Sequence, residues 1–184
     1  MPFHNEHLTI VESFADGSPR VGRMHEKGAL LREIRWHENG RVAESTDFAE
    51  GQFHGSRITW FEDGCLKTET EFKAGVMEGR HREWHPGGLQ VKEESHWRDG
   101  QLHGPFHEWH LNGRLRREAT LKEGKGLYSA YNEEGKKTEE YEMAGPVRHG
   151  RSVLFLPDGR SVESQWLNGT EVGLRRADRP VNFE

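Results

Sequence analysis

The amino-acid sequence predicts an all-β fold, an antiparallel β-hairpin repeat array with a period of about 24 residues. Three observations predict it: an internal repeat, glycines at regular intervals, and aromatic residues that return at fixed places between them. A single-layer meander and a curled sheet both fit this pattern. Helices confined between these glycines would be only about three turns long, and each glycine would cost about 1 kcal/mol. The pattern therefore favours strands.

Two glycine turns in each period set the number of repeats. The first turns are marked by Gly40, Gly64, Gly88, Gly113, Gly135 and Gly159, and the second turns by Gly51, Gly75, Gly100, Gly124, Gly145 and Gly169. Many follow Asn or Asp, and such steps favour hairpin turns because these residues tolerate positive φ. The interval from Gly124 to Gly135 is short, and we expect a tighter turn at Lys125 to absorb the difference.

Aromatic residues recur on both strands of each predicted hairpin. The first strands end with Trp36, Trp60, Trp84, Trp109, Tyr131 and Phe155, and the second strands carry Phe48, Phe72, Trp97, Leu121, Tyr141 and Trp166. Stacked on one face of a sheet, such rings form cross-strand pairs worth roughly 0.2–1 kcal/mol each. Between 88 and 100, strand alternation would put Gln90 and Trp97 on opposite faces, so we expect a β-bulge there.

Composition excludes several classes of protein. Hydrophobic residues make up 32% of the 184 residues, and the mean hydropathy is −0.96, which suits a repeat stack better than a two-layer core. The net charge of −5 gives no general attraction to nucleic acid or anionic lipid. Cys65 is the only cysteine, so no internal disulfide forms. The sequence shows no signal peptide or membrane span, and we expect a cytoplasmic protein.

The repeat pattern divides the chain into three parts. Residues 1–39 read as a degenerate N-terminal capping repeat, since terminal repeats are often atypical. Residues 40–173 hold the regular hairpin repeats. Residues 174–184 have left the period and form a C-terminal tail.

One motif carries a resemblance to a known family. It is an aromatic, a turn glycine, a glutamate, an aromatic and two glycines, seen at Trp60, Gly64, Glu69, Phe72, Gly75 and Gly79 and again at Trp84, Gly88, Glu93, Trp97, Gly100 and Gly104. Over about three quarters of the chain this pattern resembles the MORN repeat variant of bacterial proteins described as YwqK-type antitoxins. The resemblance implies a binding scaffold, attributed in that family to protein binding, lipid association or toxin neutralisation. Glu78 departs from it, because histidines occupy the equivalent positions in neighbouring repeats.

The repeated histidines and glutamates do not form a predicted metal or catalytic site. His37, His85 and His110 are equivalent positions on strands about 9–10 Å apart, too far to share an ion with bonds of about 2.1 Å. The glutamates of the repeat recur in every unit, whereas catalysis needs one asymmetric constellation. We interpret them as a solvated row offset by basic residues such as Arg57 and Arg82. We therefore predict no enzyme, no metal and no cofactor.

A protein-binding role is the function that the sequence favours. The predicted partner surface is Phe61, His85, Phe106 and His110, which lie near the ends of first strands on the face opposite the aromatic ladder. The expected partner is a toxin or effector that the protein occludes, and no nucleic acid is expected. The alternatives are a membrane- or lipid-associated scaffold and, third, a metal-dependent enzyme.

Overall fold

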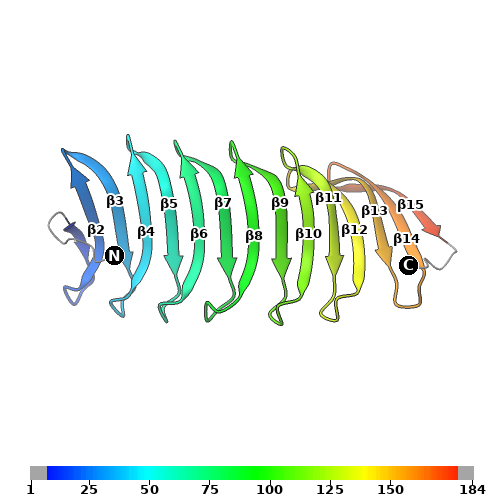
Figure 1. Cartoon of the computed structure of the whole chain (residues 1–184), viewed down its shortest axis with the longest axis horizontal. Helices are drawn as coiled ribbons and strands as arrows, with labels where there is room; N and C mark the ends of the chain where they lie inside the picture. The colour runs from blue at the N-terminus through cyan, green and yellow to red at the C-terminus, as the bar shows by residue number, and fades with distance from the viewer. Residues whose placement is uncertain (1–7, 178–184) are drawn as a thin grey trace. The chain divides into compact units, whose positions relative to one another are not determined.

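The computed structural model describes residues 8–177, with side chains for residues 8–173, and these residues contain strands and no helix. All pairs with a defined register are antiparallel, and strands adjacent in the chain are adjacent in one sheet that is not closed (Figure 1). The all-β hairpin repeat array is therefore confirmed. The strands are β1 (Leu8–Ser13), β2 (Pro19–Glu26), β3 (Ala29–Trp36), β4 (Val42–Ala49), β5 (Gln52–Trp60), β6 (Leu66–Lys73), β7 (Val76–Trp84), β8 (Val91–Arg98), β9 (Gln101–Trp109), β10 (Leu115–Leu121), β11 (Lys125–Tyr131), β12 (Lys137–Ala144), β13 (Val147–Phe155), β14 (Ser161–Leu167) and β15 (Thr170–Ala177).

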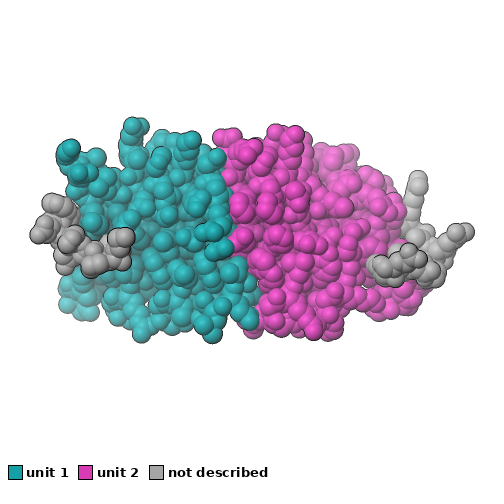
Figure 2. Space-filling view, viewed as in Figure 1, with its two compact units in different colours: residues 1–91 teal, residues 92–184 magenta. Residues whose placement is uncertain are grey.

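The chain divides into two compact units, an N-terminal unit of residues 1–91 and a C-terminal unit of residues 92–184 (Figure 2). The described part of the predicted cap, residues 8–39, forms β1, β2 and β3, which pair in antiparallel register. β15 extends the predicted array by four residues, to Ala177. Residues 1–7 of the predicted cap and residues 178–184 of the predicted tail lie outside the described residues.

The second turns are two-residue turns, and all except the turn at Gly145 and Pro146 are of one kind. In the turn after β6, Ala74 and Gly75 both have positive φ, at 48° and 82°, which is the conformation that suits a right-twisted hairpin. The turn at Lys125 is no tighter, since Glu123 and Gly124 adopt φ of 52° and 72° in the same way. The expectation of a tighter turn there is wrong. The missing residues come from β11, whose register against β10 is unbroken.

The other repeats contain a β-bulge that β11 lacks. The register shifts between β4 and β5, β6 and β7, β8 and β9, and β12 and β13. Four glycines with φ between 93° and 105° lie at these shifts, namely Gly55, Gly79, Gly104 and Gly150. The shift between Ser95 and Trp97 is one of this repeated set, and its extra residues lie on β9 around Gly104, because only glycine readily takes this backbone conformation. It is therefore not the bulge expected between Gln90 and Trp97. The extra residue of that segment lies in the first turn, where the N–H of His85 donates to the carbonyl of Gln90, whereas in the preceding repeat Phe61 donates to Cys65.

Aromatic rings form a separate cluster in each unit. In the N-terminal unit Phe53 makes edge-on contacts with Phe48 and Phe72, at centroid distances of 5.2 and 5.4 Å. In the C-terminal unit, a cluster of Phe106, Tyr128 and Tyr141 is buried together with Ala119 and Leu121. The predicted ladder rings Phe48 and Phe72 therefore both contact Phe53 on the intervening strand, and the ladder ring Tyr141 stacks on Tyr128. Such contacts add about 0.5–1.5 kcal/mol per pair beyond the buried area.

Candidate functional site

The N-terminal unit carries an apolar groove of about 630 Å³ across β3, β4 and β5. Ile34, Ser45 and Ile58 are directly opposite one another in the register, so their side chains share one face of the sheet. Because serine is much smaller than the two isoleucines, the middle strand forms the floor and its neighbours form the walls. The groove thus follows from a one-residue difference in size within a single row of the sheet.

Two tryptophans bound the groove at its first-turn end. Trp36 and Trp60 end β3 and β5 and line the groove together. As their strands are two apart, their backbones are about 10 Å apart. Behind Trp36, a Cβ on Gly22 would lie only 2.9 Å from Cη2 of the indole, so glycine makes room for this ring. The rings are therefore placed by the repeat period and by the absence of a side chain on β2.

Charged side chains stand at both ends of the groove. Arg32 Nε donates to Asp47 Oδ1 at 2.6 Å at the second-turn end. Arg41 lines the first-turn end, lies across Gly64, and donates from Nη1 to the carbonyl oxygen of Asp63. Of the charged residues that line the groove, two are cationic and one is anionic. The groove therefore carries one positive charge in a chain of net charge −5.

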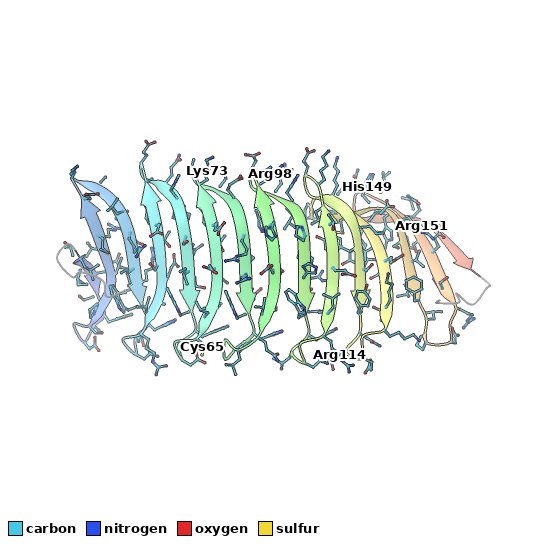
Figure 3. The ribbon with its side chains drawn as sticks, in the orientation of Figure 1. Cys65, Lys73, Arg98, Arg114, His149 and Arg151 are labelled. Carbon is cyan, nitrogen blue, oxygen red and sulfur yellow. The ribbon has the colours of Figure 1, made fainter. Side chains whose placement is uncertain are left out.

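The groove is confined to this part of the N-terminal unit. One strand further along the same row, Ile58 faces Glu69, and Glu69 faces Arg82. Arg80 also lies 3.9 Å from the Glu69 carboxylate. A polar, charged row therefore replaces the apolar one at β6. Figure 3 shows β6 with Cys65 at its first-turn end and Lys73 at its second-turn end.

Phe61 and His85, two of the predicted partner residues, lie in successive first turns of the N-terminal unit. Phe61 directly follows Trp60, and Lys67 Nζ lies 5.7 Å from the centre of its half-buried ring. Its backbone closes the turn with Gly64 and Cys65, and His85 closes the next turn with Gly88 and Gln90. Phe61 is therefore next to the groove, and the structure leaves its role in binding a prediction.

The other two predicted partner residues, Phe106 and His110, lie in the C-terminal unit, and their side chains contact other residues of the same chain. Phe106 is only 5% exposed and packs on Tyr128 at 5.3 Å, so its ring belongs to the core and offers no free surface. His110 Nε2 lies 2.9 Å from the carbonyl oxygen of Tyr131 in the next repeat. His37 makes the equivalent contact with Trp60 at 3.0 Å. At these two positions histidine links successive first turns.

The titratable groups of the repeats are paired within the sheet. Within residues 8–177 no three His, Cys, Asp or Glu side chains are grouped as metal ligands. His81 Nδ1 lies 2.8 Å from Thr70 Oγ1 across β6 and β7, and burial lowers the pKa of this imidazole. Burial acts to raise the pKa of Glu33, but hydrogen bonds from Arg23 and Arg35 outweigh it and hold that pKa below its usual value. The contacts of His81 with Thr70 and of Arg23 with Glu33 join neighbouring strands, and Arg35 contacts Glu33 within β3.

Comparisons with known proteins give no functional assignment. No family model matches the chain, and no curated protein matches it. Among solved structures, the chain is similar to one described as accessory secretory protein 1, 2 and 3 of Streptococcus pneumoniae, with 19% identity and a TM-score of 0.32. That similarity covers 70% of this chain and 22% of the other chain. A TM-score this low carries no argument about fold or function. Residues 8–177 also contain no helix that could cross a membrane.

The sequence contained a signal for the groove that spacing alone did not resolve. Ile34 and Ile58 are one period apart, and each stands two residues before a ladder tryptophan, so they share its face. The groove also depends on the strand register that puts Ser45 between these two isoleucines, and the spacing of the repeats does not give that register. Arg41 follows a first-turn glycine, as Arg114 and Arg160 do, and Arg114 donates to the carbonyl oxygen of Glu133 in the same way. Because arginine recurs at this position, the sequence did not single out Arg41.

Proposed function

We propose that this chain is a non-catalytic protein-binding repeat protein, and that it acts as a cytoplasmic bacterial antitoxin or immunity protein that binds and occludes a toxin. The observation that carries the binding role is the groove between Trp36 and Trp60. It is an apolar, partly open surface on a chain whose mean hydropathy is −0.96. Apolar surface of this kind, rimmed by polar residues, marks sites of interaction.

The narrower role as an antitoxin rests on the resemblance to YwqK-type repeat proteins. A rigid repeated sheet suits occlusion, since preorganised surfaces lose little entropy on binding. The groove also offers what protein interfaces use most, which is an apolar pocket for a central anchor side chain. The two isoleucines and two tryptophans that form it are held by strands rather than loops.

A genetic test with a biochemical step addresses the proposal. The full chain is used to capture a partner from its native host, and the captured protein is then expressed alone and together with this chain. The proposal predicts that the captured protein arrests growth and that co-expression restores it. A monomer that captures no partner, or a partner that is harmless on its own, would overturn the antitoxin role. Sedimentation with anionic vesicles would instead favour a lipid scaffold, and a stoichiometric bound metal would favour an enzyme.

A further inference from the structure

The charges around the groove indicate the chemistry of what binds there. The Asp47 carboxylate is held by Arg32 at 2.6 Å and also accepts the Ser56 N–H at 3.3 Å, so these groups neutralise one another. Arg41 is different, because its guanidinium donates to a neutral carbonyl oxygen and forms no ion pair with the residues that the structure describes. Its charge lies at the rim, exposed and next to the two tryptophans. A ligand carboxylate is the natural partner for such a guanidinium.

From this arrangement we infer that the groove binds a segment of the partner protein in which a large apolar side chain lies beside an aspartate or glutamate. The apolar side chain enters between Trp36 and Trp60 and rests on Ser45, and the carboxylate contacts Arg41. The volume of about 630 Å³ lies within the range of about 300–1,000 Å³ that is typical of ligand pockets. The inference deepens the proposed function, on which it rests for the identity of the partner.

Charge disfavours a membrane surface as the occupant. An anionic membrane needs a cluster of several basic residues, each contributing about 1 kcal/mol, and the groove has one unpaired cation. Acidic residues also line the turns beside it, among them Glu38 and Glu62 near Trp36. A single carboxylate on an apolar anchor matches one arginine at the edge of an apolar groove. A diffuse anionic surface does not.

The site can be tested before a partner is known, with anilinonaphthalene sulfonate as the probe. This molecule has an apolar aromatic body and a single negative charge, and its fluorescence rises in apolar surroundings. We expect one binding site on the full chain. Ser45→Ile, which raises the floor and leaves the walls intact, should weaken binding by at least about tenfold. Arg41→Gln, which removes only the charge at an exposed turn, should weaken it by about tenfold and reduce its salt dependence.

Two matched variants serve as controls. Thr68→Ile also introduces an isoleucine, but on β6 and on the face of the sheet opposite to the groove. Lys73→Gln removes an exposed cation at the second-turn end of β6, far from the first-turn end where Arg41 lies. Both should bind the probe within about twofold of the parent chain, and circular dichroism checks that each variant is folded. Equal effects of Ser45→Ile and Thr68→Ile, or of Arg41→Gln and Lys73→Gln, would overturn the site.

The same variants separate this inference from the proposed function. If growth rescue fails while probe binding depends on Ser45 and Arg41, the antitoxin role is wrong and the site is retained. If a partner rescues growth and binds Ser45→Ile and Arg41→Gln as tightly as the parent chain, the partner uses another surface and the inference is wrong. If vesicles of phosphatidylglycerol compete with the probe, the groove binds a lipid and not a peptide segment. If the parent chain forms a dimer that Ser45→Ile abolishes, the groove binds a second copy of this chain.

Discussion

Oε2 of Glu71 lies 2.0 Å from the position that a Cβ on Gly79 would occupy, and the same oxygen accepts the backbone N–H of Arg80 at 3.0 Å. The bulge therefore has a carboxylate cap, and glycine leaves the space in which the carboxylate lies. Two other bulges repeat this arrangement, with Asp47 accepting from Ser56 and Glu142 accepting from Arg151.

The fourth bulge, at Gly104, has neither the backbone N–H donor nor the carboxylate acceptor of this contact. Gly104 is followed by Pro105, which has no N–H to donate, and the residue near Gly104 is His96. Nδ1 of His96 is buried without a hydrogen-bond partner. The carboxylate is thus found at those bulges where a backbone N–H needs an acceptor.

Gly79→Ala should therefore destabilise the protein more than Gly104→Ala does. Both substitutions put a side chain at positive φ, near 105° and 93°, which costs about 1–2 kcal/mol. At Gly79 the new methyl also displaces Glu71 and breaks its hydrogen bond, adding about 1–2 kcal/mol. At Gly104 the nearest atom would be 3.7 Å away, so no such term arises. Urea unfolding of the two variants measures the difference, and equal losses would contradict the capping role.

His110→Ala separates a structural role from a binding role. Because the imidazole bonds to the Tyr131 carbonyl, its removal should lower the free energy of unfolding by about 1 kcal/mol. Affinity for a captured partner should be unchanged. His103→Ala, in the same unit, is the control and should cost less. A loss of affinity without a loss of stability would show that His110 contacts the partner, as the sequence predicted.

His81 makes a pH-dependent contribution to stability. Burial lowers the pKa of its imidazole below the ordinary value of 6.5, so the unfolded chain binds the proton more readily than the folded one. The contribution is present in full above pH 6.5 and is lost as pH falls through the lower folded pKa. When the pH is lowered from about 7.5 to about 5, the free energy of unfolding should therefore fall more in the parent chain than in His81→Gln. These two pH values lie about one unit or more on either side of 6.5. Parallel pH profiles from urea titrations would refute this.

Phe53 should matter more for stability than its position in the sequence pattern indicated. Its ring bridges Phe48 and Phe72, so Phe53→Ala removes two ring contacts and the buried area of a half-buried phenyl, about 2–3 kcal/mol in total. Phe61→Ala, with one lysine contact, should cost less than half as much. Thermal and urea unfolding of both variants check this. A similar loss for both would mean that the bridging contacts are energetically minor.

The contrast between Phe53 and the ladder residues shows where sequence reasoning stops. Turn chemistry is local, so glycines after Asn or Asp predicted the hairpins correctly, whereas alternation put a bulge between Gln90 and Trp97 when the extra residue lies in the turn that His85 and Gln90 close. Phe53, by contrast, stands two residues before the bulge at Gly55, where alternation fails. Its pairing with Phe48 follows from the turn at Gly51, but its contact with Phe72 on β6 depends on how many extra residues the bulge holds. The groove has the same origin, because only the register brings Ser45 between Ile34 and Ile58.

Tyr128 provides a spectroscopic test of the C-terminal cluster. Burial raises the pKa of its phenol from 10.0 to about 12, and the neighbouring Tyr141 adds to the effect. A phenol with a raised pKa stabilises the fold fully below pH 10, and that contribution is lost as pH rises through about 12. Absorbance of phenolate in the native protein should therefore show a titration step near pH 12 that is missing in Tyr128→Phe. The parent chain in concentrated urea should lose this step, since all its phenols are then solvated and ionise near pH 10. If the variant instead lacks a step near pH 10 in the folded protein, Tyr128 is solvated and its stacking on Tyr141, at 5.3 Å, does not exclude water.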